Sequence, residues 1–187
     1  MNYKETLEYI HSIPKFNRVL GNALLEKLLN KMGNPQDNLK FIHIGGTNGK
    51  GSTCTMVSQI LTEAGYKTGL FTSPFLKFFN ERIKINGIPI SNSDLADIAS
   101  YVKNMTEKYD AFVSEFAFDT AVAFEYFNRQ NCDFVILEVG LGGKLDATNI
   151  IKNPLVVGFT AIGLDHCQYL GNTIAVSYTH LTLPTKL

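Results

Sequence analysis

Apolar residues follow two different spacings along this chain of 187 residues. Helical spacing predicts five helices, over residues 3–12, 22–32, 53–64, 91–109 and 115–130. Short apolar runs bounded by Gly and Pro predict strands over residues 41–44, 68–72, 133–139 and 155–160. The Asn86-Gly87 pair predicts a hairpin between residues 82–85 and 88–90. Strands and helices therefore alternate, which predicts a doubly wound α/β fold with a mostly parallel, buried sheet.

The helix expected over residues 115–130 is rich in aromatic side chains. Large apolar side chains are usually buried in a protein core. We interpret them as packing residues: Phe116, Phe118, Phe124, Tyr126 and Phe127. The chain has no internal repeat and no linker-like stretch. Its length fits one domain with a substantial core.

Composition narrows the function classes. Hydrophobic residues make up 45% of the chain, and 17 Lys and Arg balance 17 Asp and Glu, so we expect neither a nucleic-acid partner nor a membrane partner. Cys54, Cys132 and Cys167 form no CxxC pair, which favours reduced thiols. The N-terminus lacks the basic and apolar regions of a signal peptide. We expect a cytoplasmic protein.

The run GGTNGKGS at residues 45–52 joins the first strand to the helix that follows it. Glycines let a loop turn its N–H groups onto phosphate, the helix N-terminus favours an anion, and Lys50 supplies a mobile charge. An ordinary Gly-rich turn is the alternative. Gly51 stands where a Walker loop places its magnesium-binding hydroxyl, so that hydroxyl would come from elsewhere. A GTPase is disfavoured because no Asn-Lys-x-Asp run is present.

Loops that follow parallel strands meet at one edge of a sheet, where ligands bind in doubly wound folds. Besides the glycine loop, this edge would carry Ser73 and Glu138, a hydroxyl and a carboxylate of the kind that Mg²⁺ accepts as ligands. His166 follows the last strand beside Asp165. It is either a metal ligand oriented by that carboxylate, a proton-transfer group or a structural histidine.

Four ordered motifs make the chain resemble the folylpolyglutamate synthase and dihydrofolate synthase family of Mur ligases: GTNGKGS, TSPF with FNERI, VILEVGLGGKLDATN and GLDHCQYLG. The resemblance implies a P-loop ATPase domain of Mur ligase type. It also implies an ATP-dependent amide ligase that phosphorylates the carboxylate of dihydropteroate or folate and then adds L-glutamate. A complete member would be a monomer. A stand-alone Mg-ATP-binding module without ligase activity is the alternative.

The resemblance also implies roles for individual residues. Catalysis would involve Lys50 and His166. ATP would bind at Gly46, Thr47, Asn48, Gly49, Lys50, Gly51 and Ser52. Magnesium would be held by Ser73, Glu138 and His166, so that Ser73 supplies the hydroxyl that Gly51 lacks. The pterin substrate would bind at Ser114, Glu115, Phe116, Ala117, Leu145, Asp146 and Ala147. Residues 74–82 would form a mobile loop near the active site.

The chain departs from the family at several places. Family members usually carry Glu at the position of Ala117, which bears on pterin recognition, and often Arg at the position of Lys144. Residues 1–175 resemble the N-terminal part and part of the central ATP-binding domain. Residues 176–187 do not resemble the lysine-bearing helix of the family. We therefore expect a truncated domain without the C-terminal ligase domain, and an inactive fragment.

Overall fold

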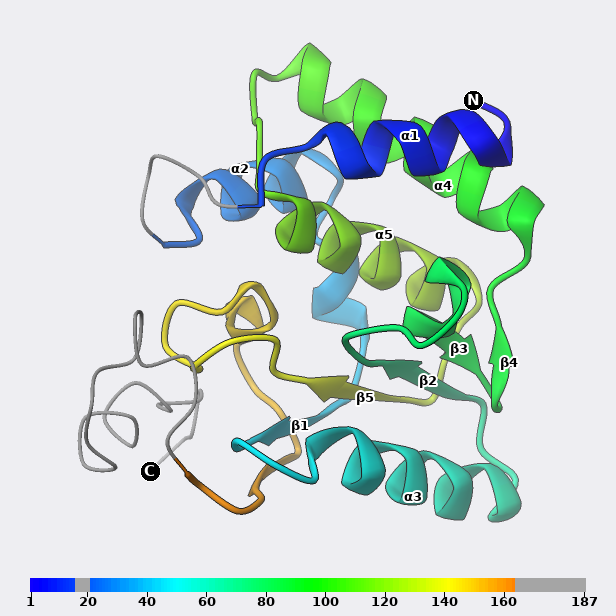
Figure 1. Cartoon of the computed structure of the whole chain (residues 1–187), viewed down its shortest axis with the longest axis vertical. Helices are drawn as coiled ribbons and strands as arrows, with labels where there is room; N and C mark the ends of the chain where they lie inside the picture. Colours follow the sequence, from blue (N-terminus) through cyan, green and yellow to red (C-terminus); the bar gives the residue numbers. More distant parts are fainter. Residues whose placement is uncertain (16–20, 164–187) are drawn as a thin grey trace.

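The computed structural model describes residues 1–15 and 21–163. Its centre is a sheet with the strand order β4-β3-β2-β5-β1-β6 (Figure 1). The strands are β1 (Phe41–Gly45), β2 (Thr68–Phe71), β3 (Ile83–Ile85), β4 (Ile88–Pro89), β5 (Phe134–Glu138) and β6 (Val156–Phe159). The pairs β2–β5, β5–β1 and β1–β6 are parallel. The hairpin strands β3 and β4 are antiparallel to each other, and β3 pairs with β2 in antiparallel orientation. The mostly parallel sheet predicted from the sequence is confirmed.

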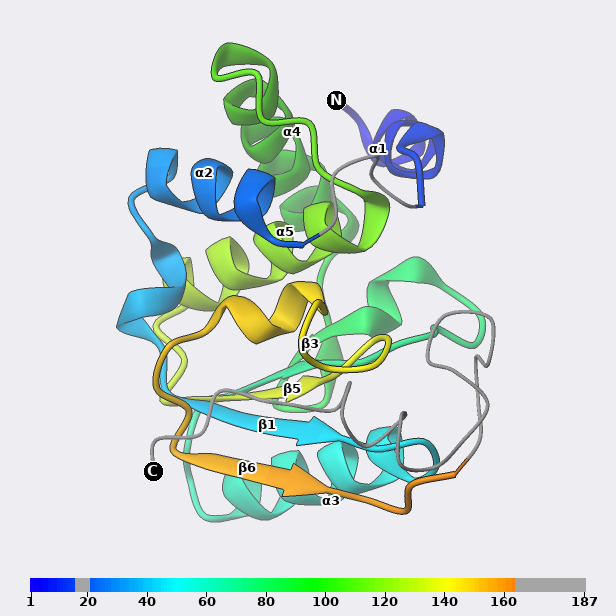
Figure 2. The same ribbon diagram turned by 90° about the vertical axis from the view of Figure 1, so that its left-hand side faces the viewer.

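Helices cover both faces of this sheet. One face carries α1 (Tyr3–Ser12), α2 (Ala23–Lys31), α4 (Asn92–Lys108) and α5 (Glu115–Arg129), whereas α3 (Lys50–Glu63) lies on the other face (Figures 1 and 2). The helix ends follow local sequence signals. Ser91 caps α4 by accepting the Asp94 N–H at 3.0 Å, and the Asn2 and Glu5 side chains form a capping box on α1.

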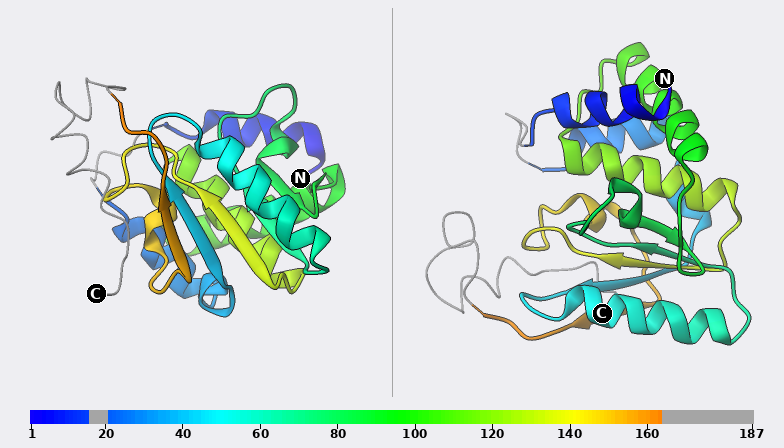
Figure 3. Two further views of the ribbon diagram at one scale, coloured as in Figure 1. Left: turned by 90° about the horizontal axis from the view of Figure 1, so that it is seen from below. Right: turned by 45° about the vertical axis from the view of Figure 1, so that its right-hand side comes forward.

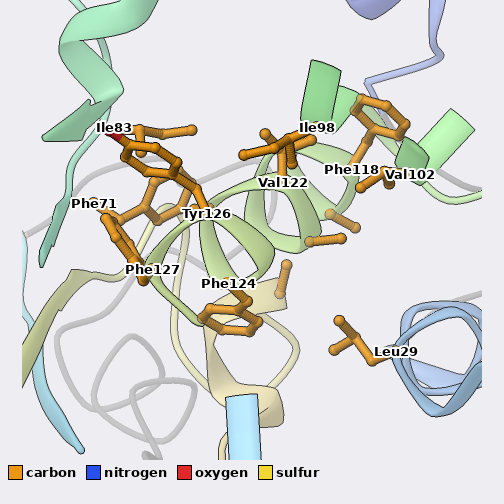
Figure 4. Packing of buried hydrophobic residues seen from close by; sticks show 14 of the residues in the cluster. Leu29, Phe71, Ile83, Ile98, Val102, Phe118, Val122, Phe124, Tyr126 and Phe127 are labelled. Atoms are coloured by element: carbon orange, nitrogen blue, oxygen red, sulfur yellow. The ribbon is translucent and has the colours of Figure 1, made fainter. Parts of the chain in front are cut away.

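Helix α5 is the central element of the larger core, between the sheet and the other helices of its face (Figure 4). Its aromatic residues Phe118, Phe124 and Phe127 are fully buried, and Tyr126 is 8% exposed. The interpretation of these four residues as packing residues is confirmed. Phe116, at the start of the helix, is only partly buried and lies at the border of this core.

The other face of the sheet has a much smaller core, formed by Ile44, Cys54, Leu70 and Ile136 beneath α3. Helix α3 packs mainly on β1, β2 and β5, so β6 lies beside it rather than under it (Figure 3, left). Val156 and Phe159 of β6 are 52% and 46% exposed. The expectation that this strand is buried is therefore wrong, because β6 is the edge strand of the described sheet.

The predicted elements all occur, with ends that differ by a few residues at most. The spacing of apolar residues did not predict three short 3-10 segments, namely η1 (Pro35–Asn38), η2 (Phe79–Arg82) and η3 (Ala147–Ile150). Each covers four residues, too short for a helical period to be visible. In the described part of the chain no helix has the length and apolarity needed to cross a membrane. Cys54 and Cys132 are buried free thiols, and Cys167 lies outside the described residues.

Candidate nucleotide and substrate site

The glycine loop runs from the end of β1 into the first turn of α3. Gly49 is the N-cap of that helix with a φ of 85°, and Gly46 has a φ of 132°. A Cβ atom on Gly46 would overlap the Thr160 Oγ1 atom and would lie 3.1 Å from the Thr160 backbone nitrogen. Only glycine fits at this position, because both the backbone conformation and the space exclude a side chain. The start of the glycine loop therefore lies directly against Thr160, the residue that follows β6.

Lys50 folds back over the loop that precedes it. Its ammonium group donates to the carbonyl oxygens of Gly46 at 2.9 Å and Thr47 at 3.1 Å. The loop is also tied to the segment after β6, since the N–H groups of Thr47 and Asn48 both donate to the Ala161 carbonyl oxygen, at 2.8 and 3.2 Å. A cation thus lies at the N-terminus of a 14-residue helix, inside a glycine-rich turn. This arrangement suits an anionic phosphate.

Glu138, at the end of β5, lies beside this loop. The strand register pairs it with Ile44 of β1, and its carboxylate accepts the Ser73 N–H at 3.0 Å. A Cβ atom on Gly51 would lie 3.4 Å from the Glu138 Oε2 atom. The structure thus brings three of the predicted site positions, Gly51, Ser73 and Glu138, to one point at the carboxyl edge of the sheet.

The environment of Glu138 fits a metal ligand. The residue is 5% exposed, and burial raises the pKa of its carboxyl group. The Ser73 N–H, the Lys50 charge and the Gly51 N–H oppose that rise. A buried carboxylate without a full counter-charge is stabilised by a cation, and Mg²⁺ needs few protein oxygen ligands. Glu138 and the Ser73 hydroxyl match this requirement, while His166 lies outside the described residues. Within residues 1–15 and 21–163, no three His, Cys, Asp or Glu residues cluster as a metal site.

The predicted pterin residues of α5 lie next to the end of β2. The Phe116 ring stacks on Phe71 at 5.6 Å between ring centroids and lies where a Cβ atom on Gly140 would meet it at 2.6 Å. Glu115 contacts His11 of α1 at 3.3 Å, and Ser114 is the N-cap residue. Ala117 is 6% exposed and belongs to the main core, so its methyl group contributes packing.

The segment after β5 is organised by Asp146. Its carboxylate accepts the Leu141 N–H at 2.8 Å, the Thr148 N–H at 2.9 Å and the Thr148 hydroxyl. Burial raises the pKa of this carboxyl group, and the hydrogen bonds oppose the rise. Ala147 is 7% exposed, whereas Leu145 is 55% exposed at the surface. Among the predicted substrate residues of this segment, Leu145 is therefore the accessible one.

The hydrogen-bond chain continues to a buried histidine on β1. Thr148 donates its hydroxyl to Asp146, so the His43 Nε2–H donates to Thr148 Oγ1, at 2.8 Å. His43 is fully buried, and desolvation lowers its pKa to about 4, so the ring is neutral at pH 7. Sequence spacing does not reveal this contact, because 105 positions separate His43 and Thr148.

A second buried polar contact lies between the end of η2 and α5. The Arg82 Nε atom is 3.8 Å from the Asp119 Oδ2 atom, and Asp119 is 1% exposed. Burial raises the pKa of Asp119 to about 8, although the Arg82 charge opposes that rise. No sequence pattern indicated this contact, since 37 positions separate Arg82, at the end of η2, from Asp119, inside α5.

Comparison with known proteins identifies clear relatives. Residues 44–187 match the model of the Mur ligase middle domain. The chain is 40% identical over 185 residues to the folylpolyglutamate synthase of Lacticaseibacillus casei, covering 96% of this chain and 43% of that protein. It is 42% identical over 177 residues to the dihydrofolate synthase/folylpolyglutamate synthase of Bacillus subtilis (strain 168), covering 92% and 41%. A solved FPGS–AMPPCP–folate complex superposes with a TM-score of 0.91 at 40% identity, covering 97% and 45%. The chain thus spans less than half the length of these relatives.

Proposed function

Since this chain belongs to the folylpolyglutamate synthase and dihydrofolate synthase family of Mur ligases, we propose that it is the ATP-binding part of a ligase of folate metabolism. The ligase joins L-glutamate to dihydropteroate or to a folate, in the cytoplasm. The observation that carries the proposal is the meeting of Gly51, Ser73 and Glu138 beside Lys50. A relative has been solved with AMPPCP and folate, which supports the same pair of ligand classes for this chain.

In this proposal the glycine loop, residues 46–52, binds the ATP phosphates. Lys50 leaves the Gly46 and Thr47 carbonyl oxygens and contacts the terminal phosphate, where it neutralises charge on the transferring group. Ser73, Glu138 and His166 would hold Mg²⁺ from the protein side, and the cation would offset the negative charge of the phosphates. Mutual positioning of phosphate and carboxylate supplies the remaining rate enhancement.

The organic acid lies on the other side of Glu138, at the residues predicted for the pterin. Its carboxylate receives the phosphoryl group as an acyl phosphate, and the amino group of glutamate then displaces phosphate. Phe116 offers part of a ring face, although Phe71 and Gly140 already cover much of it. The organic acid would contact the exposed Leu145 and the start of α5. Asp146 and Ala147 are buried, so they would support this region without contacting the organic acid.

The test of this proposal is Mg-ATP binding by the whole chain. Lys50→Ala should weaken Mg-ATP binding by at least about tenfold, because it removes a charge-assisted phosphate contact. Lys4→Ala is the matched control, since Lys4 pairs with Glu8 on the exposed surface of α1, where its side chain is 87% exposed. Equal affinities of the wild type and the Lys50→Ala variant would contradict the phosphate assignment. Preferential binding of GTP would contradict the family assignment of the loop.

A second candidate function is Mg-ATP binding without ligase chemistry. It needs only Lys50 and the meeting of Gly51, Ser73 and Glu138, which the described structure contains. Phosphate release with ATP, dihydropteroate and L-glutamate separates the two candidates. We expect this chain to bind Mg-ATP without sustained glutamate-dependent turnover. Robust turnover by the 187 residues alone would show that they hold the complete site.

A further inference from the structure

The residues that follow β6 lie against the glycine loop. Strands β1 and β6 are parallel neighbours that end at the same edge of the sheet, so the chain after β6 passes the start of the loop (Figure 2). The Thr160 N–H and hydroxyl both donate to the Gly45 carbonyl oxygen, at 2.9 and 3.2 Å. We refer to residues 160–163 as the post-β6 segment. Its first residue is thus bound to the last residue of β1.

Thr47 binds this segment with both its backbone and its side chain. Its N–H donates to the Ala161 carbonyl oxygen at 2.8 Å, and the Asn48 N–H donates to the same oxygen at 3.2 Å. The Thr47 hydroxyl donates to the Gly163 carbonyl oxygen at 3.1 Å and accepts the Gly163 N–H at 3.0 Å. One hydroxyl group therefore pairs with both backbone polar groups of Gly163, because it is a donor and an acceptor at once.

These bonds divide the N–H groups of the loop into two sets. Those of Thr47 and Asn48 are already bound to Ala161. The first four N–H groups of a helix have no partner within the helix. In α3, one of these four, that of Gly51, is directed at Glu138. The other three can receive phosphate oxygens, namely those of Gly49, Lys50 and Ser52.

Phosphate binding removes one of the present supports of the loop. The Lys50 ammonium group binds the Gly46 and Thr47 carbonyl oxygens, and the proposed function requires it to turn to the terminal phosphate. The bonds between Thr47 and the post-β6 segment do not involve Lys50, so they can persist when the ammonium group leaves. Glycines give an unsupported loop a large conformational freedom. A support outside the loop therefore matters most when ATP binds.

We propose that Thr47 is a positioning residue whose hydroxyl, bound to Gly163, holds the glycine loop in the shape that receives the phosphates. The inference rests on the proposed function, and it gives Thr47 a supporting role in place of a direct phosphate contact. A loop that already has its bound shape loses less conformational entropy on binding, so it binds more tightly. In this role the Thr47 hydroxyl stays on Gly163 when the nucleotide is present.

The experiment compares Mg-ATP binding by the wild-type chain, Thr47→Val and Thr47→Ser. Valine keeps the branched shape of threonine and lacks the hydroxyl, whereas serine keeps the hydroxyl. Thr47→Val should raise the Mg-ATP dissociation constant by about tenfold, because both hydrogen bonds to Gly163 are lost. Thr47→Ser should stay within about twofold of the wild type, since it retains both bonds. Urea unfolding establishes that each variant is folded.

Thr62→Val is the matched control. The Thr62 hydroxyl donates to the Ser58 carbonyl oxygen at 2.9 Å, near the other end of the same helix. Its loss removes a threonine hydroxyl bond of similar length far from the loop, so the Mg-ATP affinity should stay within about twofold of the wild type.

Amide hydrogen exchange separates support from direct phosphate contact. In Thr47→Val without nucleotide, the Gly163 N–H should exchange about tenfold faster than in the wild type, because its acceptor is gone. In the wild type, Mg-ATP should leave this exchange unchanged or slow it. A hydroxyl that moved to the phosphate would release the Gly163 N–H and speed its exchange.

Equal Mg-ATP affinities of the wild type and a folded Thr47→Val would overturn the inference and leave the proposed function intact. A Thr47→Ser variant as weak as Thr47→Val would also overturn it. Faster Gly163 exchange in the wild type with Mg-ATP would do the same, and this measurement applies even if Thr47→Val does not fold. A folded wild type that does not bind Mg-ATP would overturn the proposed function and the inference together.

Discussion

The two halves of the candidate site are built in different ways. At the predicted nucleotide end, residues 46–52 carry a recognisable local pattern, namely glycines with positive φ and a lysine that binds carbonyl oxygens three and four residues before it, and two N–H groups of the loop also bind the distant Ala161 carbonyl oxygen. At the predicted substrate end, the 140–150 segment is organised by Asp146 within the segment and by a buried contact with the distant His43. The local glycine pattern can be recognised from a motif, whereas the buried polar contacts become visible only in the folded chain.

The largest effect should come from Gly46→Ala at the nucleotide end. The new Cβ atom would overlap Thr160 and would force an unfavourable φ, so we expect a loss of about 4 kcal/mol in the free energy of unfolding and of detectable Mg-ATP binding. Gly65→Ala is the matched control, since Gly65 has a φ of 90° but no atom lies within 4 Å of the position that its Cβ would take. It should cost about 1 kcal/mol. Urea unfolding measures both, and equal losses would contradict the close approach to Thr160.

Asp146→Asn should damage the substrate end instead. The carboxylate binds two backbone N–H groups and the Thr148 hydroxyl in a buried place, and an amide cannot accept all of them. We expect a loss of about 3 kcal/mol in unfolding free energy and weaker dihydropteroate binding, with Mg-ATP affinity retained. Asp133→Asn, which affects one exposed N–H bond from Lys67, should cost under about 1 kcal/mol. If Asp146→Asn weakened dihydropteroate and Mg-ATP binding equally, the two ends of the site would not be independent.

A smaller effect should appear as a pH dependence that involves His43. Its pKa in the folded chain, about 4, is below the ordinary value of 6.5, so the unfolded chain binds more protons between these values. Stability is therefore complete above pH 6.5 and falls as the pH decreases towards 4. Between about pH 7.5 and about pH 5 the wild type should lose about 2 kcal/mol more than His43→Gln, in urea unfolding at each pH.

If His43→Gln and the wild type lose stability in parallel, His43 is not a buried neutral ring, and the Thr148 contact does not order the 140–150 segment in the way described.

The contrast between the two ends also explains what the sequence could predict. Helix and strand positions follow from the spacing of apolar residues, and the glycine loop follows from the strand before it and the helix after it. The approach of Ser73 and Glu138 follows from the parallel order of the strands. The Arg82–Asp119 contact and the hydrogen bonds between Thr47 and Gly163 do not follow, because each depends on how loops pack after the sheet has formed.

Whether the glycine loop and Glu138 form one Mg-ATP site can be decided by the ATP dissociation constant, measured with and without Mg²⁺ in the wild type and in Glu138→Gln. We expect Mg²⁺ to tighten ATP binding to the wild type by about tenfold or more. Glu138→Gln should lose this gain while magnesium-free ATP binding persists, because the variant lacks only the carboxylate that holds the cation. An equal magnesium-dependent gain in both proteins would show that Glu138 is not part of the site.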